Sequence, residues 1–203
     1  MNQIESIVPI SIFGPVVKFA LIKHYKAQIE KCESYQKRSL RNRLVILSAN
    51  GPLTLSVPLK KGKNNLPIEK VEIAYDEDWQ RDHLRSIMSA YGNSPYFEYY
   101  YDSIKDIYNQ KRTYLMEFGL DTVNFINKIL GIDSYKLTTR YIKSQEVKFD
   151  MRNKEFNFNY DQVPYFQVFE DKFNFTPNLS ILDLIFNLGP ESINIINKTN
   201  IYK

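Results

Sequence analysis

The polar side chains best suited to binding an anion fall in one short stretch. Seven of them stand close together: Glu33, Tyr35, Gln36, Lys37, Arg41, Asn42 and Arg43. Arginine binds phosphate or carboxylate through paired hydrogen bonds, and lysine contributes a mobile positive charge. Arg41 and Arg43 are two residues apart, so they share a face if a strand begins there. The stretch predicts a binding site for an anionic group, with a hydrated loop as the structural alternative.

The excess positive charge of the chain lies around this stretch. The sequence has 27 basic and 23 acidic residues, a net charge of +4. No acidic residue occurs between Ser34 and Ile68, whereas this acid-free segment contains seven basic ones: Lys37, Arg38, Arg41, Arg43, Lys60, Lys61 and Lys63. An anionic small molecule, such as a nucleotide sugar or an acyl donor, is therefore the predicted partner. The short basic segment and a pI of 8.9 argue against nucleic acid.

His83 is the candidate for proton transfer. It lies on a stripe of residues at helical spacing that runs from Trp79 to Tyr91. A neutral imidazole suits a general base near pH 7, while a core histidine is the alternative interpretation. Nearby, Tyr91 and Tyr96 are candidates for contact with a sugar or a base, with aromatic packing between helices as the alternative.

Several common mechanisms lack their residues. The sequence has no phosphate-binding glycine loop, dinucleotide turn or nucleophile elbow. Its two histidines, His24 and His83, and its single cysteine, Cys32, predict no metal site, and the sequence leaves any other cofactor unknown. No apolar run approaches the roughly 20 residues that cross a bilayer. Because residues 1–6 also lack a signal-peptide pattern, we expect a cytoplasmic protein.

The elements that must position these residues predict a mixed α/β fold in one domain over residues 1–203. A mixed sheet is expected from the N-terminal half, with strands over 7–13, 27–32 and 68–73 and a hairpin of 44–49 and 53–59 joined at Asn50-Gly51. Helices are expected to pack on it, over 16–25, 79–91, a segment opened by Ser94-Pro95, 120–130 and a segment capped by Ser180. Within the single domain, residues 78–131 are expected to form a helical subregion. Residues 135–143 predict a strand, 145–177 a loop-rich region and 194–201 a frayed end.

The sequence resembles the WbqC-like protein family in pieces that keep their order along most of the chain. The matching pieces are residues 9–20, 33–37, 41–43, 49–52, 55–59, Trp79 with His83, 89–91, 94–100 and 177–184. Many members carry an aromatic-rich Q-P-x-Y-F-P-x-x-G-Y stretch near the start, of which this chain keeps only Pro9, Phe13 and Phe19. The family occurs in bacterial gene clusters for O-antigen and other surface polysaccharides. An aminoacyl (glycine) transfer onto an amino sugar has been suggested for some members.

This resemblance implies a transferase in surface polysaccharide synthesis, with acyl or aminoacyl transfer to an activated amino sugar. In that hypothesis Lys37, Arg41 and Arg43 hold a phosphate, and His83 is the general base. The remaining predicted binding residues are Tyr35, Gln36, Asn42, Tyr91 and Tyr96.

The alternative is a non-catalytic module that binds an anionic glycan intermediate or a partner enzyme. An open cavity shared by His83 and Arg41 or Arg43 favours the enzyme, whereas a His83 enclosed by Trp79 and Ile87 favours the binder. RNA binding, a third hypothesis, predicts affinity that falls steeply with salt. The sequence predicts neither donor and acceptor nor oligomeric state.

Overall fold

Four short parallel strands form the central sheet of the computed structural model, which describes residues 4–61, 65–133, 135–153 and 155–203. Their order is β5 (Lys136–Leu137), β2 (Gln28–Glu30), β1 (Ile4–Pro9) and β6 (Val147–Asp150). Because every pair is parallel, the carboxyl ends of all four strands meet at one edge of the sheet. Lys63 lies outside the described residues.

Helix α1 (Val16–Tyr25) connects β1 to β2 and is buried through most of its length. The apolar run that predicted this helix explains its burial, since neighbours cover it on several sides. Lys26 ends the helix in a left-handed conformation, and β2 begins two residues later. β1 itself starts and ends earlier than predicted, so residues 10–13 form a buried loop between β1 and α1.

The predicted hairpin is confirmed as β3 (Arg43–Ser48) and β4 (Gly51–Ser56), but it forms a sheet of its own. The expectation that it joins the other strands in one mixed sheet was wrong. Its turn also lies one residue earlier than predicted, because Ser48 pairs with Gly51 and leaves Ala49 and Asn50 in the loop. The Ser48 hydroxyl fixes that turn by donating to the Gly51 carbonyl (2.8 Å) and accepting from the Asn50 amide (3.2 Å).

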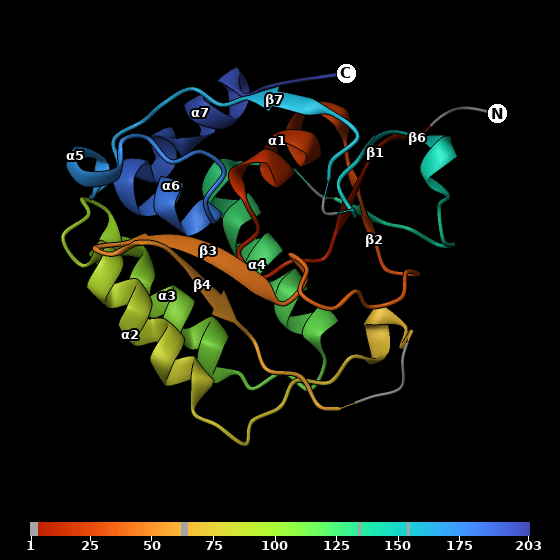
Figure 1. The fold of residues 1–203 in the computed structure, drawn as a ribbon, viewed down its shortest axis with the longest axis horizontal. Coiled ribbons are helices and arrows are strands. Elements are labelled where there is room, and N and C mark those ends of the chain that lie inside the picture. Colours follow the sequence, from red (N-terminus) through yellow and green to blue (C-terminus); the bar gives the residue numbers. More distant parts are fainter. Residues whose placement is uncertain (1–3, 62–64, 134, 154) are drawn as a thin grey trace.

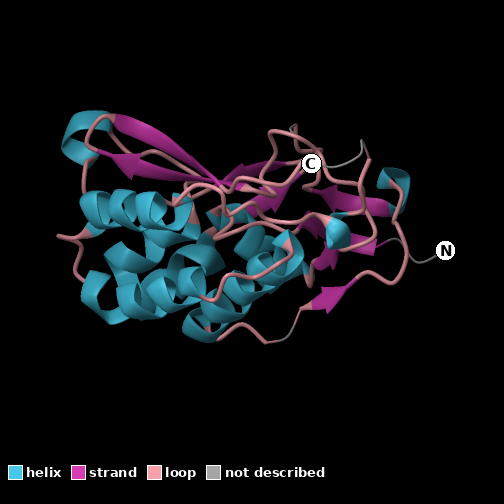
Figure 2. Cartoon of the chain, turned by 90° about the horizontal axis from the view of Figure 1, so that it is seen from below, coloured by secondary structure: helices cyan, strands magenta, loops and turns pink. Residues whose placement is uncertain are grey.

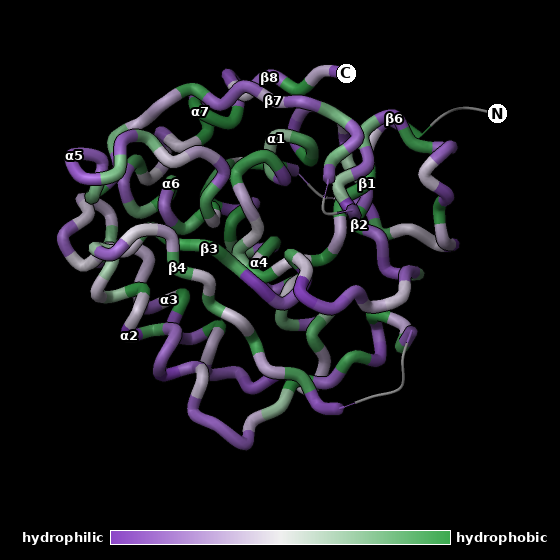
Figure 3. The backbone as a smooth tube through the Cα atoms, in the orientation of Figure 1, coloured by the Kyte–Doolittle hydropathy of each residue, from purple (hydrophilic) through white to green (hydrophobic). Residues whose placement is uncertain are grey.

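The two faces of the hairpin differ in character. Leu44, Ile46 and Leu55 alternate with more exposed residues, as expected for a half-buried pair of strands. Arg43 and Val45 point to the opposite face. Figure 2 shows the hairpin as an outer layer over the helices, and Figure 3 shows β3 passing from hydrophilic at its start to hydrophobic along its length. One face of the hairpin is therefore less buried than the other.

Three helices make up the middle of the chain, as the helical spacing predicted: α2 (Trp79–Tyr91), α3 (Phe97–Asn109) and α4 (Leu115–Leu130). α2 ends at Gly92 and α4 at Gly131, which adopts the left-handed conformation common at helix ends. Ser94 is not the N-cap of α3. It starts a tight turn, in which the Phe97 amide donates to the Ser94 carbonyl (3.1 Å), and Tyr96 occupies the cap position.

The C-terminal third is more ordered than its sequence predicts (Figure 1). It contains β7 (Asn159–Asp161), α5 (Glu170–Phe173), α6 (Ile181–Leu188), α7 (Ser192–Lys198) and β8 (Asn200–Tyr202). Ser180 caps α6 as predicted, its hydroxyl accepting from the Leu182 amide. The expected frayed end was wrong, because β8 pairs with β7 and α7 packs against α1.

Three 3₁₀ turns complete the described elements: η1 (Ile68–Lys70), η2 (Ser144–Glu146) and η3 (Gly189–Glu191). The first replaces the strand predicted over residues 68–73. Pro67 starts this turn, and the Lys70 amide donates to its carbonyl (2.8 Å). No helix within the described ranges is long and apolar enough to cross a membrane. The α/β class and its helices are confirmed.

Candidate functional site

A buried group of charged side chains occupies the carboxyl edge of the parallel sheet. Glu30 is the last residue of β2 and Asp150 the last of β6, and both are almost fully buried. Arg152 connects them: its Nη1 donates to Glu30 Oε2 (3.0 Å), and its Nη2 and Nε donate to the two Asp150 oxygens (2.6 and 2.9 Å). Ligands of open α/β sheets bind at this edge, so the charges mark a candidate site.

Glu30 also joins the chain segments around this edge. Its carboxylate accepts from the Thr138 hydroxyl (2.5 Å), which follows β5, and from the amides of Cys32 (2.9 Å) and Ile142 (3.1 Å). A buried carboxylate needs such donors to offset the loss of water. Glu30 therefore fixes the loops that follow β2 and β5, and these loops surround the site.

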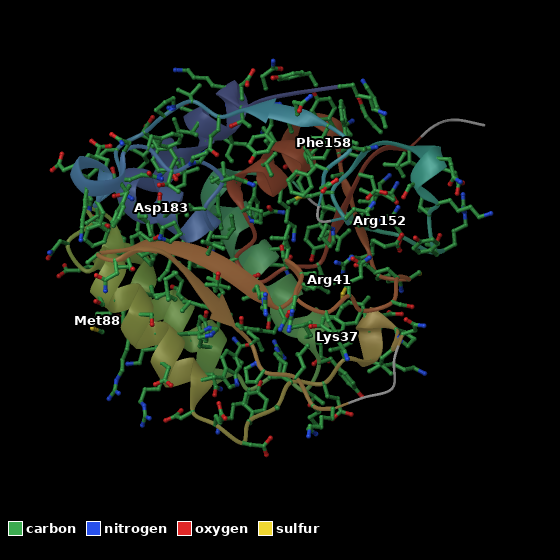
Figure 4. All side chains as sticks on the ribbon, viewed as in Figure 1. Lys37, Arg41, Met88, Arg152, Phe158 and Asp183 are labelled. Carbon is green, nitrogen blue, oxygen red and sulfur yellow. The ribbon has the colours of Figure 1, made fainter. Side chains whose placement is uncertain are left out.

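Arg41 and Glu33 form a second buried ion pair beside the first. Arg41 is 1% exposed and donates from Nε to Glu33 Oε1 (2.7 Å) and from Nη2 to Glu33 Oε2. The same guanidinium lies 3.4 Å from the Arg152 carbonyl through both Nη atoms. Figure 4 shows Arg41 and Arg152 near one another beside β2. We call Glu30, Glu33, Arg41, Asp150 and Arg152 the ion cluster.

The ion cluster shifts the pKa of two of its carboxyl groups in opposite directions. Burial raises the pKa of Glu33 above its usual value, and the hydrogen bond and charge of Arg41 only partly oppose that effect. Burial acts the same way on Asp150, but the hydrogen bonds and charge of Arg152 outweigh it and lower the pKa of Asp150. Asp150 thus remains ionised and holds Arg152 in place.

Two cavities adjoin the ion cluster. The first, which we call the polar cavity, has a volume of about 400 Å³ and is lined mainly by polar side chains: Cys32, Glu33, Ser34, Tyr35, Gln36, Asn65, Tyr141, Ser144, Arg152 and Asn153. The second, which we call the arginine cavity, has a volume of about 320 Å³. Its described lining has four arginines and no acidic residue: Gln36, Arg38, Ser39, Leu40, Arg41, Arg43, Val45, Thr54, Arg152, Asn153 and Phe156. Three of these residues, Gln36, Arg152 and Asn153, line both cavities.

The four arginines of the arginine cavity are not equivalent. Arg41 and Arg152 are each paired with buried carboxylates of the ion cluster. Arg38 is exposed and Arg43 is partly buried. The Arg43 Nε is buried and makes no hydrogen bond to any residue that the structure describes. A buried cationic donor without a partner is unfavourable.

The other residues predicted from the acid-free segment take different places. The Tyr35 hydroxyl donates to Asn42 Oδ1 (3.0 Å), and Asn42 Nδ2 donates to the Val57 carbonyl (2.9 Å), so Asn42 braces the start of the hairpin. Tyr35 and Gln36 line the polar cavity. Lys37 is exposed and is absent from the described lining of both cavities.

His83 lies away from these cavities, in a buried aromatic group on α2. Its Nδ1 is 3.2 Å from the Tyr108 hydroxyl and its Nε2 is 3.2 Å from the Ser56 carbonyl. The Trp79 ring packs edge-on against it at 5.1 Å. Burial lowers the pKa of His83 to about 4, so the imidazole is neutral at pH 7. It lines neither cavity as described, and its role as a general base stays a prediction that these surroundings weigh against.

Tyr91 and Tyr96 lie near α6 and line neither cavity in the described part of the chain. Tyr91 is fully buried, and its hydroxyl accepts from the Leu47 amide (3.2 Å). The Tyr91 ring packs 5.2 Å from Phe186. The Tyr96 amide donates to the Phe186 carbonyl (3.0 Å). Both residues join α2 and α3 to α6, which is the packing role given above as the alternative.

Sequence analysis missed several residues of the site. Glu30 was read only as part of a strand, and Asp150 and Arg152 lie in a region interpreted as loop-rich. Tyr141 was placed in a strand, whereas it follows the two residues of β5 and lines the polar cavity. Arg38 was counted with the basic residues but not proposed for binding. The one available signal for Arg152 was its position two residues after Asp150, at the end of a short β-prone run.

Comparison with known proteins places the chain in a family. The model of the WbqC-like protein family matches residues 27–151 and 134–195, which include both cavities and the ion cluster. The chain therefore belongs to the WbqC-like protein family. No curated protein and no solved structure matches the chain. Within the described residues, no group of three or more His, Cys, Asp or Glu side chains could hold a metal ion.

Proposed function

We propose that this protein binds a phosphorylated sugar at the carboxyl edge of the parallel sheet, as a step in bacterial surface polysaccharide synthesis. One observation carries the proposal: the arginine cavity is lined by four arginines and by no acidic residue that the structure describes. A phosphate or pyrophosphate group matches this lining, because guanidinium groups donate paired, charge-assisted hydrogen bonds to phosphate oxygens.

The ion cluster supports this proposal because it gives the four arginines of the arginine cavity two different roles. Arg41 and Arg152 have most of their donors engaged by carboxylates and backbone carbonyls, so they act as positioning residues that shape the cavity. Arg43 and Arg38 line the cavity without a carboxylate partner that the structure describes, so their guanidiniums are the candidates for holding a ligand. Rigid neighbours reduce the entropy lost when a ligand binds. In this proposal Arg43 and Arg38 hold the phosphate, and Lys37 attracts the anion from solvent.

Membership of the WbqC-like protein family is what favours a transferase over a carrier. The surroundings of His83 favour the carrier, since its ring packs against Trp79 and lines neither cavity as described. The polar and arginine cavities share Gln36, Arg152 and Asn153, so one phosphorylated sugar can span both. Acyl or aminoacyl transfer to the bound sugar is the reaction that we propose. If His83 is its base, His83→Gln must abolish transfer while the protein stays folded; an unchanged rate removes His83 from the mechanism.

The binding proposal is tested by calorimetric titration with UDP-N-acetylglucosamine and with pyrophosphate. We expect Arg43→Gln to weaken both affinities about tenfold or more, since a charge-assisted hydrogen bond to the phosphate is lost. Arg85→Gln is the matched control, because Arg85 is an exposed arginine on α2 outside both cavities. Equal affinities for the wild-type protein and Arg43→Gln would contradict the proposal.

A further inference from the structure

The polar cavity differs chemically from the arginine cavity beside it. Its lining supplies hydroxyl groups, side-chain amides and one carboxylate: Ser34, Tyr35, Ser144, Gln36, Asn65, Asn153 and Glu33. Its guanidinium, that of Arg152, is paired with both Glu30 and Asp150. Since Glu33 and Arg152 are both already paired with opposite charges, the described lining offers phosphate no unpaired cation, and phosphate is poorly matched to this cavity. The hydroxyl groups of a sugar are well matched, because each can donate to a carboxylate or amide oxygen and accept from an amide.

Glu33 has acceptor capacity left for such a ligand. Among the residues that the structure describes, each of its oxygens accepts one hydrogen bond, and both come from Arg41. An ionised carboxylate has about four lone-pair sites, so each oxygen can accept a further donor. Because the guanidinium of Arg41 holds Glu33 in one orientation, the remaining sites have fixed positions at the cavity wall. Fixed acceptors of this kind set the orientation of a ligand.

Tyr141 adds an aromatic surface to this polar wall. The residue lines the polar cavity and remains 51% exposed, although tyrosine rings of this size are usually more buried. Its ring centroid lies 5.1 Å from the guanidinium carbon of Arg152, which is itself 4% exposed and fixed by two carboxylates. This cation–π contact holds the ring against the ion cluster. An exposed ring held in one position beside hydrogen-bonding groups suits the apolar C–H face of a sugar ring.

We propose that the polar cavity is the subsite for the sugar ring, with Tyr141 as its stacking surface and Glu33 as an acceptor for its hydroxyl groups. This inference rests on the proposed function, which places the phosphate in the arginine cavity. The shared wall of Gln36, Arg152 and Asn153 is then where the bond between sugar and phosphate lies. Tyr141 acts as a specificity-determining residue for the sugar and leaves phosphate binding unaffected.

The test compares two probes that differ by the sugar: UDP-N-acetylglucosamine and UDP. We expect Tyr141→Ala to weaken the affinity for UDP-N-acetylglucosamine about tenfold, since stacking on an aromatic ring is lost, and to leave the affinity for UDP unchanged. Tyr141→Phe keeps the ring and should retain wild-type affinity for both probes. Tyr99→Ala is the matched control, because Tyr99 is an exposed tyrosine on α3 outside both cavities.

The failure of this inference is distinguishable from the failure of the proposed function. If Tyr141→Ala leaves the affinity for UDP-N-acetylglucosamine unchanged, or lowers both affinities equally, the sugar subsite is overturned and the phosphate site stands. If the wild-type protein binds neither UDP nor pyrophosphate, the proposed function fails. Saturation-transfer NMR with methyl glycosides then tests whether the polar cavity binds a sugar that carries no phosphate. Saturation transfer to the glycoside that is seen with the wild-type protein and lost in Tyr141→Ala supports the sugar subsite. The absence of transfer with the wild-type protein overturns it.

Discussion

The carboxyl edge of the parallel sheet and the interior around α1 both bury charged side chains. The charges are paired with opposite charges at the edge, whereas the interior leaves its charged group without one among the described residues. At the carboxyl edge, three carboxylates and two guanidiniums of the ion cluster pair with one another. In the interior, Lys18 of α1 is fully buried, and its one described partner is the Ser11 hydroxyl, which accepts from its Nζ (2.8 Å). An ion-pair partner opposes the effect of burial, in part at Glu33 and more than fully at Asp150, whereas a buried group without an opposite charge shifts its pKa toward the neutral form.

The pKa values of the isolated groups follow this rule. Burial lowers the pKa of Lys18 from 10.5 to about 7. Burial raises the pKa of Asp183 on α6 from 3.8 to about 6, although Tyr165 and Gln167 donate to its Oδ2 (2.7 and 2.9 Å). His83 is the third isolated group, with its pKa lowered to about 4. None of the three lines the polar or the arginine cavity as described.

The largest effect is expected from removing Arg152, since Glu30 and Asp150 would lose their common partner. We expect Arg152→Met to lower the free energy of unfolding by about 3–5 kcal/mol, because it leaves buried carboxylates without a cation. Urea denaturation measures this change. Arg140→Gln is the control: Arg140 pairs with Glu146 at the surface, where solvent screens the pair, so the loss of stability should be far smaller. If both variants lose the same free energy of unfolding, burial does not make an ion pair costlier to break.

A smaller effect of opposite sign is expected at Lys18. The folded protein has a lower pKa for Lys18 than the unfolded chain, so its stability increases as pH rises from about 7 to 10.5. We expect Lys18→Met to stabilise the protein at pH 7 by about 2 kcal/mol and to remove that pH dependence, since no ammonium group is buried. Thermal unfolding at pH 7, 8 and 9 measures both. A variant that is less stable at each pH would show that the bond to Ser11 matters more than desolvation.

The smallest net change in the free energy of unfolding is expected on acidification, because the contributions of His83 and Asp183 change in opposite directions. His83 has a lowered pKa, so its contribution to stability is lost as pH falls from 6.5 to about 4. Asp183 has a raised pKa, so its contribution is recovered as pH falls from about 6 to 3.8. Each change amounts to roughly 3 kcal/mol, and in the wild-type protein the two nearly cancel between these values.

Two variants separate these contributions. Relative to the wild-type protein, Asp183→Asn should become less stable as pH falls from 6 to 4, since only the loss at His83 remains. His83→Gln should become more stable over the same range. Chemical denaturation at pH 4, 5 and 6 gives both differences. If the stability of each variant runs parallel to that of the wild-type protein, neither group titrates as the burial of its side chain requires.

Local elements could be predicted from the sequence because their signals are local. The Trp79–Tyr91 helix has its buried residues at helical spacing, and Gly131 stops α4 through its own backbone freedom. The parallel sheet could not be predicted in the same way. Its strands are two to six residues long, and β1 pairs with β6, which lies far along the chain. Such short strands depend on their partners for stability, so their sequences carry little periodicity.

The candidate site likewise has features that the sequence predicted and features that it did not. By itself, the sequence determined that positive charge gathers in the acid-free segment, and that a hairpin lies within this segment. Arg41 and Arg43 look alike in that segment, two residues apart and equally basic. Only the tertiary structure decided that Arg41 is committed to Glu33 while the Nε of Arg43 is left without a described partner at the arginine cavity. The physical reason is that pairing and burial are set by neighbours distant in sequence: Arg152, 111 residues beyond Arg41, contacts both Arg41 and Glu30.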